Sequence, residues 1–251
     1  MIQVELSNHV ATLTLERPPL NVLNIAMIGQ LEAHLSELKS SDAKVIVINA
    51  KGKAFCAGVD VAVHTADKVE AMIHTFHGAI RALWALPQPV LAVVAGAALG
   101  GGMELVLACD MVIASESAKF GQPEIKVGVF PPIAALLLPR MVGRQAALEC
   151  ILTGETWSAR RAFELGLVNA IAAPDQLAQT ATAWADRLAA LSGPIVQLAK
   201  KAALIGWDRA ALNERLTRIE KLYLKELMAL EDTHEGLAAF VEKRNPHWKE
   251  R

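Results

Sequence analysis

The spacing of apolar residues changes along the first two-thirds of the chain. Apolar and polar residues alternate over residues 1–15, which predicts a β-hairpin that turns near Asn8. Residues 25–38 and 71–86 carry apolar side chains at helical spacing, and prolines stop the second run. Short apolar runs between loops predict buried strands over residues 45–48, 90–94 and 111–114. Because strands alternate with helices, we expect an α/β core with parallel pairing.

The pattern becomes almost wholly helical after Ala173. Residues 207–243 carry long apolar stripes between charged positions. Helices of this kind either pack back on the core or bury a subunit interface, and the sequence leaves both open. We therefore expect residues 1–173 to form a core that holds the functional site, and residues 174–251 to form a C-terminal helical region.

The composition fits one well-packed core of nearly balanced charge. The 251 residues are 53% hydrophobic, which is enough to bury a large core. The formal net charge of −1 gives no sign of a nucleic-acid partner, which usually requires a basic excess. Three cysteines without a CxxC pair fit a reducing compartment. With no signal-peptide pattern and no apolar run long enough to span a bilayer, we expect a cytoplasmic protein that does not enter the membrane.

Two glutamates stand out because each ends a distinctive run of residues. Glu104 ends the run ALGGGME, and Glu124 ends FGQPE twenty residues later. Two carboxylates on separate scaffolds can hold one water between them and move protons to and from it. A third run, KAFCAGVD over residues 53–60, supplies small residues whose backbone N–H groups could meet a ligand oxygen. Together these runs predict an enzyme that adds water to, or removes it from, an activated double bond.

Each of these features also has a simpler structural interpretation. The glycines before Glu104 form neither a dinucleotide-binding nor a phosphate-binding loop, so alone they favour a tight turn between strand and helix. An acidic residue such as Glu104 in the first turn of a helix is ordinary dipole complementation. Glu124 is either a solvated loop residue or a carboxylate in a partly apolar site, where its pKa would rise.

The histidines and cysteines give weaker signals. His64, His74 and His77 lie near one another in the sequence, but no HExxH pattern or cysteine accompanies them. We expect a polar helix face near a pocket rather than a metal site. Cys56 has no legible catalytic partners and is expected to be a small residue lining the pocket.

Taken in order, these motifs resemble the enoyl-CoA hydratase/isomerase (crotonase) superfamily. The resemblance also covers the entry segment with Asn21, the FGQPEIKVG run and the tail around Phe240. It implies a spiral of ββα units of the ClpP/crotonase type, followed by a helical trimerisation region. It further implies an acyl-CoA substrate, assembly as a homotrimer or a dimer of trimers, and no cofactor beyond the coenzyme A of the substrate.

The resemblance also implies roles for matched positions. Glu104 and Glu124 would be the catalytic pair, one activating the water and the other handling the proton at carbon. Ala57 and Gly101 would donate backbone N–H groups to the thioester oxygen and so form an oxyanion hole. Further residues would bind coenzyme A or the acyl group; they are Lys53, Ala54, Gly58, Val59, Asp60, Pro131, Phe240 and Lys243. No metal ligand is implied.

The run after Glu124 narrows the resemblance. Residues 129–140 read VFPPIAALLLPR, where ordinary short-chain hydratases carry a glycine-rich run. The two prolines and branched residues are similar to those of cyclohexa-1,5-diene-1-carbonyl-CoA hydratases of anaerobic benzoyl-CoA degradation. This implies hydration of a cyclic, conjugated dienoyl thioester.

Other functions fit the sequence less well. The nearest is a straight-chain 2-enoyl-CoA hydratase of fatty-acid oxidation. An isomerase is less favoured, because it needs one base and has no use for two water-holding carboxylates. An RNA-binding module would need a basic helix face, and the basic pairs at residues 200–201 and 243–244 are too few for that.

Overall fold

The computed structural model describes residues 1–61, 64–65 and 67–251. The larger of its two sheets contains the N-terminal hairpin. The strands of this sheet run in the order β1-β2-β3-β5-β7-β10, with β1 and β2 antiparallel and the other pairs parallel. Asn8 and His9 adopt positive φ angles in the two-residue turn that joins β1 to β2. The predicted hairpin and parallel core are therefore confirmed. The strands are β1 (Ile2–Ser7), β2 (Val10–Leu15), β3 (Val45–Ala50), β5 (Val90–Val94), β7 (Met111–Ser115) and β10 (Ala170–Ala172).

A smaller sheet of very short strands lies beside the larger one. Its order is β4-β6-β8-β9, with only the β8–β9 pair antiparallel. Along the chain β3 leads to β4, β5 to β6 and β7 to β8, and a helix follows each pair. Successive turns therefore stack as ββα units, which confirms the expected spiral. The strands are β4 (Ala54–Cys56), β6 (Ala97–Leu99), β8 (Lys119–Gly121) and β9 (Thr156–Ser158).

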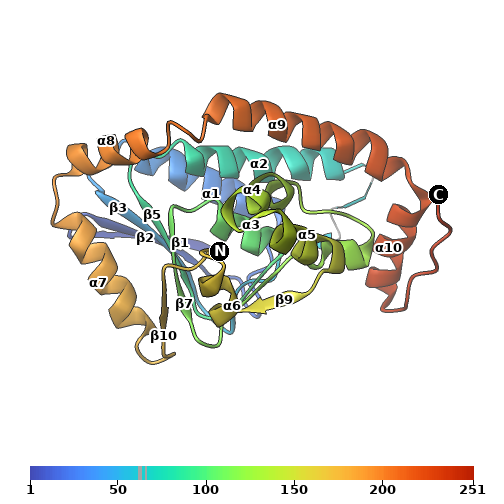
Figure 1. The fold of residues 1–251 in the computed structure, drawn as a ribbon, viewed down its shortest axis with the longest axis horizontal. Coiled ribbons are helices and arrows are strands. Elements are labelled where there is room, and N and C mark those ends of the chain that lie inside the picture. The colour runs from blue at the N-terminus through green and yellow to red at the C-terminus, as the bar shows by residue number, and fades with distance from the viewer. Residues whose placement is uncertain (62–63, 66) are drawn as a thin grey trace.

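Helices surround the two sheets (Figure 1). Asn24 begins α1 by accepting a hydrogen bond from the N–H of Met27 at 2.9 Å. The helix predicted at residues 71–86 is observed as α2, shifted by two residues. The α-helices are α1 (Ile25–Leu38), α2 (Val69–Trp84), α3 (Gly101–Leu107), α4 (Pro132–Met141), α5 (Arg144–Thr153), α6 (Ala159–Glu164), α7 (Leu177–Ala189), α8 (Gly193–Ala203), α9 (Arg209–Lys221) and α10 (Glu231–Glu242). Short 3-10 helices η2 (Pro123–Val127) and η4 (Leu227–Ala229) and a π-helix η3 (Leu222–Glu226) complete the set.

Both faces of the parallel sheet are buried, which explains why its strands are continuously apolar. On one face Ile46 and Ile48 join the main core, which also contains the buried side of α1. On the other face Val45 and Val47 pack against α7. Successive side chains of β3 thus belong alternately to two separate clusters of buried residues.

The C-terminal helices extend over the core in different directions. Figure 1 shows α8 and α9 passing along one side of the molecule near α2, and α10 at the end that holds the C-terminus. Leu212 and Leu216 of α9 belong to the main core, so this part of the helical region packs back on it. The division at Ala173 into core and helical region stays a prediction. Among the described residues, no helix combines the length and the apolar character needed to cross a membrane.

Candidate active site

A cavity of about 380 Å³ opens where the small sheet, α2, α4 and the C-terminal helices meet. Its lining is mostly apolar with a few polar groups, as is usual for small-molecule sites. The sequence predictions that fall in its lining are Ala57, Gly58, Val59, Gly101, Glu104, Glu124, Pro131 and Phe240. Residues far apart in the chain thus meet around one space.

Glu104 projects from α3 toward the start of α4. The side chain is 3% exposed, and its Oε1 accepts hydrogen bonds from the N–H groups of Ile133 at 2.8 Å and Ala134 at 3.0 Å. Pro131 and Pro132 precede these donors, so the VFPP run places the free N–H groups of a helix start on the carboxylate. Burial raises the pKa of Glu104, and the two backbone hydrogen bonds oppose that rise.

Glu124 lies in η2 and faces the turn before α3. Its Oε1 is 2.6 Å from the point that a Cβ on Gly100 would occupy. When the Gln122 amide is oriented to satisfy both partners, its nitrogen donates to the two carboxylate oxygens of Glu124 at 3.1 and 3.2 Å. Burial raises the pKa of Glu124 well above its ordinary value of 4.5, and the nearby charge of Glu104 raises it further. Glu124 is half-buried and lines the cavity, which favours the interpretation as a carboxylate in a partly apolar site over that of a solvated loop residue.

The glycine run before α3 brings two backbone segments close together. Gly100 has a φ of +53°, and a Cβ on Gly101 would lie 2.7 Å from Cγ2 of Val59. The N–H of Val59 is 3.4 Å from that same point. Gly101 is the first residue of α3, so its N–H has no acceptor within the helix.

Ala57 and Val59 differ in where their N–H groups point. The N–H of Ala57 already donates to the carbonyl of Leu20 at 3.0 Å. Val59 pairs in a parallel bridge with Leu23, in which the bonds are made by the carbonyl of Gly58 and the N–H of Asp60. The N–H of Val59 therefore points away from Leu23. It meets no acceptor in the described part of the chain, whereas the N–H of Ala57 is occupied.

Asn21 fixes the segment whose Leu20 carbonyl accepts the N–H of Ala57. Its buried side-chain amide donates to the carbonyls of Lys51 at 2.8 Å and Ala54 at 2.9 Å. These bonds hold the entry segment against β4, and they account for the Asn21 motif seen in the sequence. They also explain why the carbonyl of Leu20 sits beside Ala57.

Some predicted binding residues lie outside the cavity lining. Lys53 and Lys243 are exposed, Asp60 is half-buried, and Ala54 is buried in β4 with its carbonyl engaged by Asn21. Their contact with coenzyme A stays a prediction.

Several lining residues were not predicted as site residues. Tyr223 is 1% exposed within the π-helix η3, and its ring contacts Phe130 edge-on with 5.2 Å between centroids. Burial raises the pKa of Tyr223, so its phenol stays neutral. The sequence shows Tyr223 only as one member of an apolar stripe. His77 lines the cavity, which agrees with a polar helix face near a pocket, while His74 is 60% exposed.

Comparisons with known proteins agree with one another. The family described as enoyl-CoA hydratase/isomerase matches residues 5–251. Cyclohexa-1,5-dienecarbonyl-CoA hydratase of Thauera aromatica is 34% identical, with the alignment covering 100% of this chain and 96% of the relative. A probable enoyl-CoA hydratase of Rhizobium meliloti is 40% identical over 99% of this chain and 97% of its own. The crystal structure of carnitinyl-CoA hydratase from Mycobacterium avium superposes with a TM-score of 0.89 at 34% identity, covering 100% of this chain and 98% of that one. The chain therefore belongs to the enoyl-CoA hydratase/isomerase family.

Proposed function

We propose that this protein is a hydratase that adds water to a conjugated enoyl- or dienoyl-CoA thioester. The observation that carries the proposal is the pair of glutamates facing one cavity with different hydrogen-bond environments. Glu104 receives two N–H groups from a helix start, which favour its ionised form, while burial and the nearby charge of Glu104 raise the pKa of Glu124. Two carboxylates with one proton between them can act as base and acid in the same step.

The geometry supports Val59 and Gly101 as the oxyanion donors. The backbone N of Val59 is 3.4 Å from the Cβ position of Gly101, so the two segments lie close together, whereas the N–H of Ala57 is bonded to Leu20. A thioester carbonyl oxygen between the two would be stabilised as negative charge develops on it. Losing one such donor typically costs about 3–4 kcal/mol of barrier lowering.

The two glutamates then divide the proton transfers. Glu104, whose ionised form is stabilised by two N–H groups, takes a proton from the water as its oxygen bonds to the acyl chain. Glu124, whose protonated form is favoured by burial and by the charge of Glu104, gives a proton to the carbon that carries the delocalised charge. One O–H bond of the water, the O–H bond of Glu124 and the π bond of the C=C break, while a C–O bond, a C–H bond and an O–H bond on Glu104 form, so the proton of the pair ends on Glu104 instead of Glu124.

For the acyl group we propose cyclohexa-1,5-diene-1-carbonyl-CoA. The support is the full-length similarity to a relative named for that substrate and the VFPP run, whose Phe130, Pro131 and Pro132 form part of the cavity wall. Prolines fix the backbone of this wall, which suits a compact ring. The alternative is a straight-chain 2-enoyl-CoA, as the name of the Rhizobium meliloti relative suggests. An isomerase needs only one base and fits the two-carboxylate site less well.

The decisive assay compares the two substrates on the purified protein. Cyclohexa-1,5-diene-1-carbonyl-CoA and crotonyl-CoA are each incubated with enzyme, and the gain of one water is followed by mass spectrometry alongside kcat/KM. A higher kcat/KM for the ring would support the proposed substrate. A higher value for crotonyl-CoA would favour the straight-chain alternative, and turnover of neither would refute the hydratase proposal.

The remaining features of the proposal concern cofactors, partners and location. Proton transfer by two glutamates with an oxyanion hole needs no cofactor beyond the coenzyme A of the substrate. We also propose a homotrimer or dimer of trimers in the cytoplasm, where the buried, free cysteines would stay reduced. Nucleic acid is not a proposed partner, because Lys200 pairs with Asp110 and Arg244 pairs with Glu235.

A further inference from the structure

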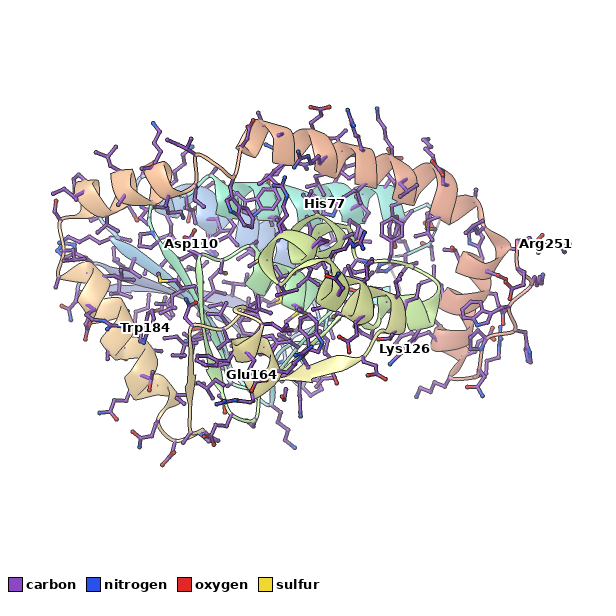
Figure 2. The ribbon with its side chains drawn as sticks, in the orientation of Figure 1. His77, Asp110, Lys126, Glu164, Trp184 and Arg251 are labelled. Atoms are coloured by element: carbon purple, nitrogen blue, oxygen red, sulfur yellow. The ribbon has the colours of Figure 1, made fainter. Side chains whose placement is uncertain are left out.

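Tyr223 is the only tyrosine in the chain, and it belongs to the lining of the cavity. It follows Glu220 of α9 by one helical turn. Oε1 of Glu220 lies 2.7 Å from Nδ1 of His77 and accepts a hydrogen bond from Arg81 at 2.7 Å, which ties the end of α9 to α2. Figure 2 labels His77 and Lys126, two other residues of the same lining. Contacts between elements far apart in the chain thus fix the turn from which Tyr223 extends.

The ring of Tyr223 packs against the segment that holds Glu104. Tyr223 lies in η3, and π-helical turns occur frequently at functional sites. Its ring contacts Phe130 edge-on. Phe130 immediately precedes Pro131, the residue before α4, and the first turn of α4 donates two N–H groups to Glu104. The aromatic contact therefore joins Tyr223 to the part of the wall that carries this carboxylate.

The hydroxyl of Tyr223 has no partner in the described part of the chain, and yet it is not sealed off. The residue is 1% exposed, and no hydrogen bond joins its hydroxyl to a described residue. The polar atoms that lack both a partner and an accessible surface do not include this oxygen. The small surface that Tyr223 exposes therefore includes the hydroxyl oxygen, and the cavity is the space that this residue lines.

The two glutamates of the cavity act on this phenol. Burial raises the pKa of Tyr223, and the charges of Glu124 and Glu104 raise it further. The phenol therefore stays protonated at neutral pH and can donate one hydrogen bond. No hydrogen bond joins the hydroxyl to either glutamate, although all three side chains line one cavity. A water molecule or a substrate oxygen bridges polar groups across a gap of this kind.

We propose that the hydroxyl of Tyr223 donates a hydrogen bond to the oxygen that the enzyme adds to the acyl group, which makes Tyr223 a further catalytic residue. This rests on the proposed function, because it takes Glu104 and Glu124 as the groups that hold the water. As Glu104 removes a proton from the water, negative charge develops on the water oxygen until its bond to carbon is complete. A donor aimed at that oxygen stabilises the charge and orients the water. The same hydrogen bond then holds the hydroxyl of the product.

The competing role for Tyr223 is to fill the wall beside Phe130. Two substitutions separate the roles. Tyr223→Phe removes the hydroxyl and leaves the ring, whereas Tyr223→Leu removes both. If Tyr223 only fills the wall, Tyr223→Phe behaves as wild type and only Tyr223→Leu loses activity. If the hydroxyl acts on the water, Tyr223→Phe already loses activity.

The first test measures kcat and KM for whichever of cyclohexa-1,5-diene-1-carbonyl-CoA and crotonyl-CoA the wild type hydrates. Tyr223→Phe should lower kcat about tenfold, the value of one hydrogen bond from a neutral donor. KM should stay unchanged, because the water and not the acyl-CoA loses a contact. A wild-type kcat in folded Tyr223→Phe would overturn this inference and leave the hydratase proposal standing. Turnover of neither thioester by the wild type would refute both.

A second test keeps the natural sequence and so does not depend on whether a variant folds. Because Tyr223 is the only tyrosine, growth on 3-fluorotyrosine places one fluorine beside its hydroxyl. The fluorine NMR resonance is recorded with butyryl-CoA and 3-hydroxybutyryl-CoA for a straight-chain enzyme, or with cyclohex-1-ene-1-carbonyl-CoA and its 6-hydroxy derivative for a ring enzyme. The hydroxylated ligand should shift the resonance further than its counterpart. Equal shifts would overturn the inference, because the product oxygen would then not meet the hydroxyl of Tyr223.

Discussion

At the scale of single residues, two glutamates line the cavity, and the groups around each of them favour different protonation states. Glu104 is met by the N–H groups of Ile133 and Ala134, which favour its ionised form. Burial and the nearby charge of Glu104 favour the protonated form of Glu124, although the amide of Gln122 donates to its carboxylate oxygens. The identity of the base and the acid therefore depends on where α4 begins.

Glu124→Gln should abolish most activity and yet stabilise the fold. Loss of a general acid lowers kcat by about 10²–10⁴-fold. Above pH 4.5 an unfolded Glu124 has lost its proton while the folded one retains it, so the free energy of unfolding falls as pH rises toward the raised pKa. Glutamine has no such proton, so at neutral pH the variant should melt at a higher temperature than wild type. Its free energy of unfolding should exceed that of wild type by about 1.4 kcal/mol for each unit by which the pKa of Glu124 is raised.

The control for that prediction is Glu116→Gln, at an exposed position outside the cavity lining. It should leave kcat and the melting temperature near wild type. The stability gain of Glu124→Gln should disappear below about pH 4.5, where both side chains are uncharged. Scanning calorimetry between pH 4 and 8 checks this, and a variant less stable than wild type at pH 7 would show that Glu124 is not a strained buried acid.

At the scale of elements, the turn between β6 and α3 is the tightest point of the site. We expect Gly100→Ala to disturb catalysis more than folding. Gly100 has φ +53° and ψ −129°, a conformation that L-residues rarely adopt, so an alanine there costs about 1–3 kcal/mol, and its Cβ would stand 2.6 Å from Oε1 of Glu124. Displacing that carboxylate by about 1 Å should lower kcat by about 100-fold.

Gly143→Ala is the matched control, because Gly143 also has a positive φ, of +83°, but no atom lies within 4 Å of its Cβ position. Both variants should lose similar stability in urea denaturation, and only Gly100→Ala should lose turnover. Equal kcat values for the two would mean that the carboxylate of Glu124 does not need its observed position.

How far the sequence predicts these elements depends on the length of each pattern. The hairpin and the buried strands have enough residues to show a period, whereas β4, β6 and β8 have three residues each and show none. The small sheet was therefore expected only from the resemblance. The glutamate pair was predicted because each member lies in a local motif. The direction of the Val59 N–H depends on pairing with Leu23, and the setting of His77 depends on Glu220 far along the chain, so neither could be predicted locally.

At the scale of the whole molecule, α8 and the turn after it expose large apolar side chains. Leu198 is 64% exposed and Ile195 68%, and Ile205, just after the helix, is 75% exposed. The sequence left open whether the C-terminal helices pack on the core or on another subunit. In the structure α7 and α9 contribute to buried clusters, while these α8 side chains do not. Clusters of this kind commonly mark interaction surfaces, and the expected trimer would cover them.

We therefore predict that α8 lies in the subunit interface, and that Leu198→Asp separates the assembly. Each leucine buried between subunits contributes about 1.5–3 kcal/mol, and a buried aspartate would add an unpaired charge to the loss. Sedimentation velocity should give the wild type a mass of three or six times the 27.0 kDa chain, and the variant a mass near 27.0 kDa. Ala183→Asp, at an exposed position of α7, is the control and should keep the wild-type mass. A monomeric wild type would refute the trimer. An assembled Leu198→Asp protein would place the interface on another face of the molecule. Neither result would change the active-site argument, because every residue in that argument comes from one chain.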